Sequence, residues 1–120
     1  MFEIKLNEEL VDFSKNKIVE RYEMAGNSKI PIYLTFKDVY LNYLGLYNSN
    51  EGKKVIKSYK IGLAIADSKA KTFKLEKDEF GILKESINSP QSMYSGIVKG
   101  QVLVYFDGVT ETKEELNQKK

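Results

Sequence analysis

The stretch Ser92–Phe106, SMYSGIVKGQVLVYF, is the segment around which the rest of the chain is expected to pack. It holds one charged residue, Lys99, among its fifteen. The β-branched and aromatic residues of Ile97–Phe106 are typical of a strand, but the two glycines and the length disfavour one continuous strand. We therefore predict a helix over Met93–Phe106, buried by the other helices, with a strand over Ile97–Phe106 as the alternative.

Two glycines inside this stretch, Gly96 and Gly100, fall on one side of the predicted helix because they are four residues apart. A glycine in a helix interior costs about 1 kcal/mol relative to alanine. Two of them therefore predict close approach by the backbone of a neighbouring segment.

Helix starts and apolar spacing predict three helices ahead of this stretch. Thr35 is a good N-cap residue, and Asp38 stands where a capping box needs an acidic side chain. The short connection after the first helix predicts that the first two helices lie antiparallel. The expected helices extend from Thr35 to about Tyr47, from residues 51–53 to Ala66, and from Glu76 or Lys77 to about Asn88, before Pro90.

Apolar residues at helical spacing predict which face of each helix is buried. On the first helix these residues are Phe36, Val39, Tyr40, Tyr43, Leu44 and Tyr47. On the second they are Val55, Ile56, Tyr59, Leu63 and Ala66. On the third they are Phe80, Leu83 and Ile87, with Ile82 beside them.

The first 34 residues favour strands. Phe2–Leu6 alternates apolar and polar residues, as a half-buried strand does. Leu10–Met24 is read as a hairpin with a turn at residues 14–17, or alternatively as part of one amphipathic helix from Asn7 to Met24. Ile30–Leu34 is expected at a sheet edge because Pro31 cannot donate to a ladder. Thr72–Leu75 is a further short extended segment.

Together these elements predict an α+β fold. A small N-terminal antiparallel β element packs on a bundle of three to four helices in a single domain, residues 1–108. Residues 109–120 are expected to be a polar C-terminal tail or a short helix, because Val109 and Leu116 are their only apolar residues.

Composition removes the usual catalytic groups. The chain has no Cys and no His, so it lacks a thiolate nucleophile and the commonest general base and metal ligand. It has no glycine-rich phosphate-binding motif. The acidic cluster Glu76, Asp78 and Glu79 is explained by the dipole at a helix start. We expect no enzyme activity, no cofactor and no metal.

No apolar run approaches the length of about twenty residues that a membrane span needs. The expectation is a protein of the cytoplasm, or of a virion, without membrane association. The net charge of +2 is too small to indicate nucleic acid by itself. Residues 51–71 carry a net charge of +4 and residues 76–85 one of −2, which predicts two helix faces that complement each other.

Tyrosine is abundant, with eight residues, and three of them share one face of the first helix. A tyrosine joins a large apolar ring to a hydroxyl, which suits both the rim of a core and an interface. The nearby lysines also allow a platform for stacked bases. The candidate interaction surface consists of Tyr40, Tyr43, Tyr47, Lys53, Lys57 and Lys60.

Several segments from Thr35 onward resemble small uncharacterised proteins encoded by tailed phages and prophages. They are TFKDV at Thr35–Val39, KSYKIGLAI at Lys57–Ile65, FKLEKDEFGILK at Phe73–Lys84, and Tyr94–Val104 with its Gly100. The likeness covers residues 35–104 and consists of helix starts and core stripes. It implies a phage or mobile-element origin and a mostly helical second half, and it brings no catalytic residues.

The expected function is therefore non-catalytic. We expect a phage or mobile-element protein that acts through protein–protein contacts, in virion assembly or in inhibition of a host factor. The alternative is that the Lys/Tyr surface binds or sequesters a nucleic acid or a nucleotide. Self-association into a homo-oligomer is compatible with either function.

Overall fold

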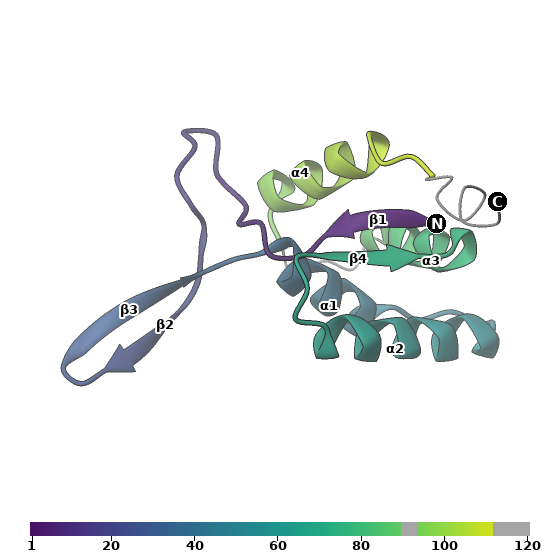
Figure 1. Cartoon of the computed structure of the whole chain (residues 1–120), viewed down its shortest axis with the longest axis horizontal. Helices are drawn as coiled ribbons and strands as arrows, with labels where there is room; N and C mark the ends of the chain where they lie inside the picture. The colour runs from purple at the N-terminus through teal and green to yellow at the C-terminus, as the bar shows by residue number, and fades with distance from the viewer. Residues whose placement is uncertain (90–93, 112–120) are drawn as a thin grey trace, which may run out of the picture.

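The computed structural model describes residues 1–89 and 94–111, which form four strands and four helices (Figure 1). The α+β class predicted from the sequence is confirmed. In chain order the elements are β1 (Phe2–Lys5), β2 (Val19–Ala25), β3 (Ser28–Tyr33), α1 (Phe36–Leu46), α2 (Gly52–Asp67), β4 (Thr72–Leu75), α3 (Lys77–Asn88) and α4 (Gly96–Asp107). None of the helices in the described ranges is long and apolar enough to span a bilayer.

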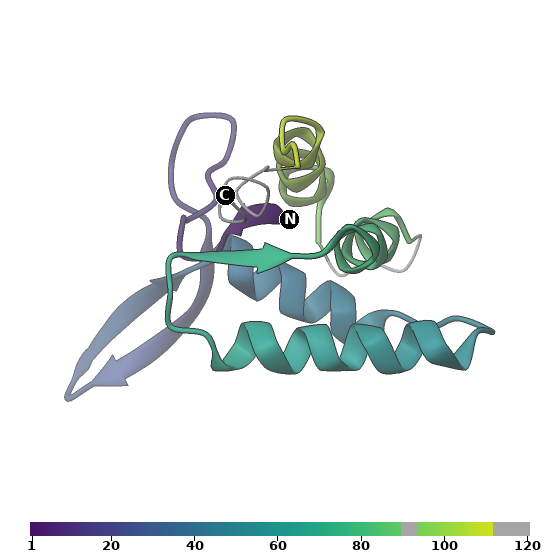
Figure 2. The same ribbon diagram turned by 45° about the vertical axis from the view of Figure 1, so that its right-hand side comes forward.

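The body of the molecule is organised around the pair β1–β4. The two strands are antiparallel, with Phe2 opposite Leu75 and Lys5 opposite Thr72. Figures 1 and 2 show this pair between α4 on one side and α1 with α2 on the other. The first strand therefore pairs with a segment some seventy residues later, and not within the first 34 residues as the sequence suggested.

Helix α1 begins at the predicted cap. The backbone N–H of Asp38 donates to the Thr35 hydroxyl over 3.2 Å, and the Asp38 carboxylate accepts from the Thr35 backbone N–H over 3.0 Å. This capping box satisfies two amides that the helix itself leaves open. Helices α1 and α2 then run antiparallel, as predicted (Figure 2).

Helix α3 also confirms its predicted start and buried stripe. The carboxylate of Glu79 accepts from the backbone N–H of Glu76 over 2.8 Å, which completes a second capping box. Phe80, Leu83 and Ile87 are buried. The acidic residues here cap the helix, and in the described part of the chain no three acidic side chains group as a metal site would require.

Helix α4 is a helix as predicted, but the expectation that the other elements enclose it is wrong. Val98, Val102 and Phe106 form its one buried stripe, while Val104 is 72% exposed. Figures 1 and 2 show α4 on the outside of the body. The helix begins at Gly96, after its N-cap Ser95, so it starts later than the predicted Met93, which itself lies outside the described residues.

The ring of Phe106 fixes α4 to the body. It lies 5.1 Å from the ring of Phe80 and 5.7 Å from that of Tyr40, measured between centroids. Aromatic pairs at such distances stabilise a fold beyond the contribution of the apolar area that they bury. One face of α4 thus closes the core, and the other face stays on the surface.

The close packing predicted at Gly96 and Gly100 is also wrong. A β-carbon built on either glycine meets no neighbouring heavy atom within 4 Å. Both glycines line an open hollow of about 430 Å³ beside Phe13 and Val104. They therefore leave space at the surface and do not admit a neighbouring backbone.

The segment before β2 is neither a full hairpin nor a helix. The predicted turn exists, since the Asp12 carboxylate accepts from the backbone N–H of Ser14 and Asn16 over 2.9 and 3.0 Å. It closes a single bridge between Val11 and Lys17. The alternative of one helix from Asn7 to Met24 is wrong, because β2 occupies its second half.

The long hairpin of this protein is β2–β3, and it projects from the body as an arm (Figures 1 and 2). Its two-residue loop has Gly26 at φ 63°, which suits the first loop position of a type II′ turn. Both strands were predicted, but the pairing between them was not. The arm contributes to the elongated shape, 55 × 38 × 28 Å.

The predicted C-terminal tail is described only as far as Glu111, and residues 112–120 lie outside the described residues. Glu111 forms an isolated antiparallel bridge with Phe2. Its carboxylate also lies 3.7 Å from the N-terminal ammonium group. The chain therefore returns to the outer side of β1 after α4.

Candidate functional site

Two of the three tyrosines predicted to form a surface are in the core. Tyr40 and Tyr43 are buried on the face of α1 that contacts the rest of the body. The ring of Tyr43 lies 5.7 Å from that of Tyr94. This is a correction: the tyrosine stripe that the sequence offered as a binding surface belongs largely to the packing of α1.

The third tyrosine, Tyr47, is half-buried where α1 ends. Its hydroxyl donates to the Glu85 carboxylate of α3 over 2.5 Å, and the Lys54 ammonium lies 3.5 Å from the same group. The hydrogen bond from Tyr47, with the positive charge of Lys54, lowers the pKa of the Glu85 carboxyl. Tyr47 therefore helps to join α1 to α3.

The three predicted lysines are on α2 and reach the surface. Lys57 forms an ion pair with Asp78 of α3. That pairing lowers the pKa of the Asp78 carboxyl and raises the pKa of the Lys57 ammonium. The complementary charge predicted for these two segments is therefore present. Within the described residues, Lys53 and Lys60 are exposed and have no ion-pair partner.

Helix α2 turns the predicted buried face outward. Ile56, Tyr59 and Leu63 are 57%, 68% and 51% exposed. The buried residues of α2 are Ser58, Ile61 and Ile65 instead. Because residues 56, 59 and 63 are spaced by three and then four positions, they form one stripe along the helix. We call this stripe the outer face of α2.

A small hollow of about 180 Å³ adjoins the outer face of α2, where the helix packs on α1. Its lining includes Tyr59, Leu63 and Gly62, together with Leu41 and Leu44 of α1. A β-carbon on Gly62 would lie 4.0 Å from the β-carbon of Leu44, an ordinary contact distance, so Gly62 stands where α2 adjoins α1. The hollow can accept an apolar side chain beside the exposed stripe.

A second pocket, of about 330 Å³, lies on the other side of the same stripe, between α2, β4 and α3. Four lysines line it, and Ile56, Ile61, Ala64 and Phe73 supply an apolar floor; the lysines are Lys53, Lys57, Lys60 and Lys74. Glu79 also lines it, and Asp78 pairs with Lys57 beside it. We call this cavity the lysine pocket.

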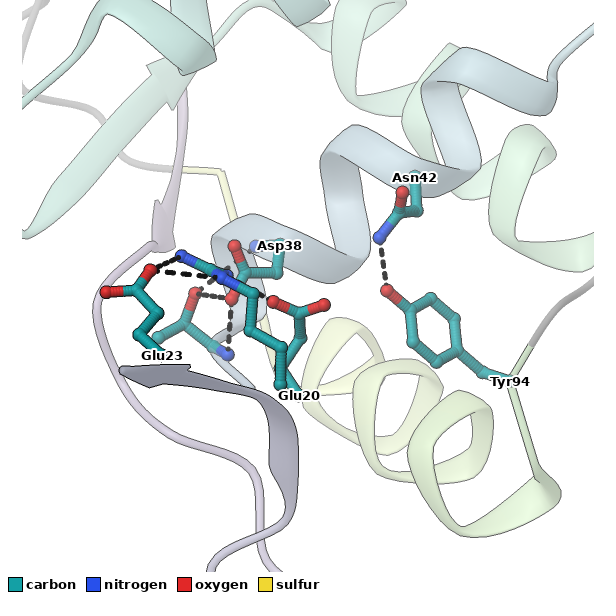
Figure 3. A network of polar contacts seen from close by, with 7 residues as sticks. Glu20, Glu23, Asp38, Asn42 and Tyr94 are labelled. Carbon is teal, nitrogen blue, oxygen red and sulfur yellow. Dashed lines mark hydrogen bonds and ion pairs between the residues drawn. The ribbon is translucent and has the colours of Figure 1, made fainter. Parts of the chain in front are cut away.

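The β2–β3 arm is a further exposed surface, and the sequence did not single it out. Tyr22 and Met24 are 61% and 64% exposed, and Ile30 is 46% exposed. The Arg21 side chain of β2 bonds to Glu20 and Glu23. Figure 3 labels these two glutamates together with Asp38, which caps α1. A signal was available: the Gly-Asn pair between two runs rich in β-branched and aromatic residues favours a hairpin.

The arm joins the body close to a second polar contact of α1. The Asn42 amide donates to the hydroxyl of Tyr94 (Figure 3). Burial raises the pKa of the Tyr94 hydroxyl, and the carboxylates of Asp38 and Glu20 add to that effect. Tyr94 thus ties the segment before α4 to the middle of α1.

Comparison of the chain with protein-family models, with curated proteins and with solved structures gives no match. The resemblance to phage-encoded proteins therefore stays a prediction. Three surfaces of the protein are candidates for a functional role: the outer face of α2 with its hollow, the lysine pocket, and the β2–β3 arm.

Proposed function

We propose that this protein acts without catalysis, by binding another protein through the outer face of α2. The observation that supports this proposal is the exposure of Ile56, Tyr59 and Leu63, three large apolar side chains in one stripe. Exposed apolar side chains that stand singly are common, whereas a contiguous set beside a hollow is typical of an interaction site.

The partner that fits this face has an apolar contact with an acidic rim. Lys53 and Lys60 flank the stripe on one side, and neither is neutralised by a partner within the described residues. A protein that placed an apolar side chain in the hollow and carboxylates beside these lysines would complement both features. Tyr59 supplies the aromatic ring that interface centres favour.

We further propose that the partner belongs to a phage or to its host. This part of the proposal rests on the sequence resemblance over residues 35–104. An assembly role and inhibition of a host factor both require only a binding surface, so the outer face of α2 would serve in either case.

Photo-crosslinking tests the proposed surface directly. The photoreactive residue p-benzoylphenylalanine replaces Tyr59 in the cells that naturally make the protein. The matched control carries it at Lys77, which is exposed on α3. We expect a discrete adduct of defined mass from position 59 and none from position 77. Equal labelling from the two positions, or no adduct from position 59, would remove the outer face of α2 as the binding site.

A second candidate function is binding of an anion such as a nucleotide or a single-stranded nucleic acid in the lysine pocket. The lysines and the Phe73 ring in the pocket floor favour it, because nucleic-acid grooves combine cations with aromatic rings. Glu79 and Asp78 oppose it, because they place negative charge at the same pocket. We therefore rank it below protein binding.

The probe for this second function is a fluorescein-labelled oligo-dT in a polarisation titration. Anion binding predicts an affinity that falls steeply between 50 and 200 mM salt, by about tenfold or more when several phosphates are contacted. The double variant Lys53→Gln and Lys60→Gln should bind the oligonucleotide more weakly than the wild type does at the same salt concentration. No polarisation change at 50 mM salt would exclude single-stranded DNA as a ligand.

A further inference from the structure

Among the residues that the structure describes, no strand pairs with the outer edge of β2, and Pro31 shows which backbone groups point toward that edge. Pro31 stands opposite Tyr22 in the register of the hairpin. Because proline has no N–H for the ladder, this pair is one in which the two residues exchange no backbone hydrogen bonds. The backbone groups of Tyr22 therefore point away from β3, toward the outer edge of β2.

The outer edges of β2 and β3 differ in their hydrogen-bond donors, because Pro31 on β3 has no backbone N–H. Hydrogen-bonded and non-bonded pairs alternate along an antiparallel ladder, so Met24 on β2 and Lys29 on β3 also point their backbone groups outward. On β3 the outward position of Pro31 lacks a donor, which blunts that edge. On β2 both Tyr22 and Met24 keep theirs, so β2 is the edge that can accept another strand.

The charges of β2 are self-complementary in one register. Two copies of β2 can form hydrogen bonds only in registers that place the outward-pointing Tyr22 and Met24 of one copy opposite outward-pointing residues of the other. If Tyr22 lies opposite Tyr22 of an antiparallel second copy, then Arg21 lies opposite Glu23 of that copy, and Glu23 opposite its Arg21. Moving the register by two residues in either direction opposes Arg21 to Arg21 or Glu23 to Glu23, which is destabilising.

We infer that this chain forms a two-fold symmetric dimer in which the outer edges of β2 from two copies pair antiparallel, with Tyr22 at the two-fold axis. The Arg21–Glu23 pairs across the axis are non-hydrogen-bonded pairs, the kind in which opposite side chains come closest. The contact is isologous and closes on itself. It joins two hairpins, each marginal as an isolated pair of strands, into one four-stranded sheet.

The dimer also covers part of the exposed apolar surface of the arm. Tyr22 and Met24 share one face of β2, because they are two residues apart. In the dimer the two Tyr22 rings become neighbours on that face, where cross-strand aromatic pairs stabilise sheets. The interface does not involve α2, so it stands apart from the proposed partner-binding face.

Charge exchange between the two positions tests this dimer. Sedimentation equilibrium of the full chain is expected to give twice the monomer mass of 13.8 kDa. The single variants Arg21→Glu and Glu23→Arg each oppose like charges across the axis in the proposed register. Each is therefore expected to weaken self-association about tenfold.

The decisive sample is an equimolar mixture of the two single variants. In a mixed pair every contact between positions 21 and 23 across the axis joins opposite charges, while the contacts within each arm stay unfavourable. We therefore expect the mixture to dimerise about as tightly as the wild type, and each variant alone to dimerise about ten times more weakly. Leu63→Asp on α2 serves as the control and should leave the dimer intact. A monomeric wild-type chain, or single variants that both dimerise as tightly as the wild type, would overturn the inference.

Discussion

The hydroxyl of Tyr40 is a polar group inside an apolar core. It is the one fully buried side-chain nitrogen or oxygen of the described residues that lacks a hydrogen-bond partner. Burial raises the pKa of this phenol well above its usual range, so it stays neutral. Its ring packs against Phe36 and Phe106. The ring contributes to packing, and the unpaired hydroxyl costs free energy.

Removing that hydroxyl should therefore stabilise the protein. We expect Tyr40→Phe to raise the free energy of unfolding by about 1 kcal/mol, because an unsatisfied buried hydroxyl costs about 1–3 kcal/mol. The matched variant is Tyr105→Phe, because the Tyr105 hydroxyl accepts from the Lys5 backbone N–H over 2.9 Å. It should lower stability by about 1 kcal/mol. Urea unfolding compares the two, and a loss of stability in Tyr40→Phe would contradict this account.

Helix α2 provides an internal comparison, because two of its isoleucines have opposite surroundings. Ile65 is buried, and Ile56 is 57% exposed on the outer face. Ile65→Ala should lower the free energy of unfolding by about 2–5 kcal/mol, since it leaves a cavity. Ile56→Ala should change it by less than about 1 kcal/mol. Equal losses in thermal or urea unfolding would mean that the outer face of α2 packs against the body.

The ion pair between α2 and α3 predicts a pH dependence with a defined sign. The Lys57 hydrogen bond lowers the pKa of Asp78 below its ordinary value of 3.8. The pair therefore stabilises the fold above that pH, and its contribution disappears as the pH falls through the lower folded-state value. Comparing wild type with Asp78→Asn by urea unfolding, we expect a difference at pH 7 that vanishes near pH 2. A difference that grew toward low pH would refute the assignment.

Which helices form could be predicted, because the signals for helix starts are local. Thr35 with Asp38 marks the start of α1, and the spacing of Phe80, Leu83 and Ile87 marks the buried face of α3. The buried face of α2 could not be predicted in the same way. That helix carries apolar residues on two faces, and contact with α1 and α3 decides which one is covered.

The candidate site was predicted only in part, for the same reason. The sequence placed Lys53, Lys57 and Lys60 on the surface correctly, because charged side chains rarely bury without partners. It offered Tyr40 and Tyr43 as surface residues, although they share their stripe with Phe36 and other core residues. Tyrosine suits the core and the interface equally, so spacing alone does not separate the two roles.

The pairing of β1 with β4 and the projection of the arm belong to the whole molecule. The first depends on contacts between residues some seventy positions apart, which no local pattern encodes. The projection of the arm depends on the fact that no other described helix or strand packs over β2 and β3. The body is therefore stabilised by an apolar core, whereas the arm is stabilised by the backbone hydrogen bonds between β2 and β3.

Amide hydrogen exchange should register the proposed dimer at single residues. The backbone N–H of Tyr22 points outward from β2, so it should exchange rapidly at low concentration and slowly once the dimer forms. The N–H of Lys29 points outward from β3 and serves as the control, because dimerisation leaves that edge free. Slower amide exchange at Lys29 with unchanged exchange at Tyr22 would place the contact on β3 and contradict the proposed dimer.

The central claim is that the outer face of α2 exists for binding and not for folding. The most direct measurement is the adduct formed by p-benzoylphenylalanine at position 59, compared in chains with and without Leu63→Asp. We expect the substitution to abolish the adduct while the unfolding midpoint changes by only a few degrees. An adduct that persists, or a chain that unfolds because of the substitution, would contradict it.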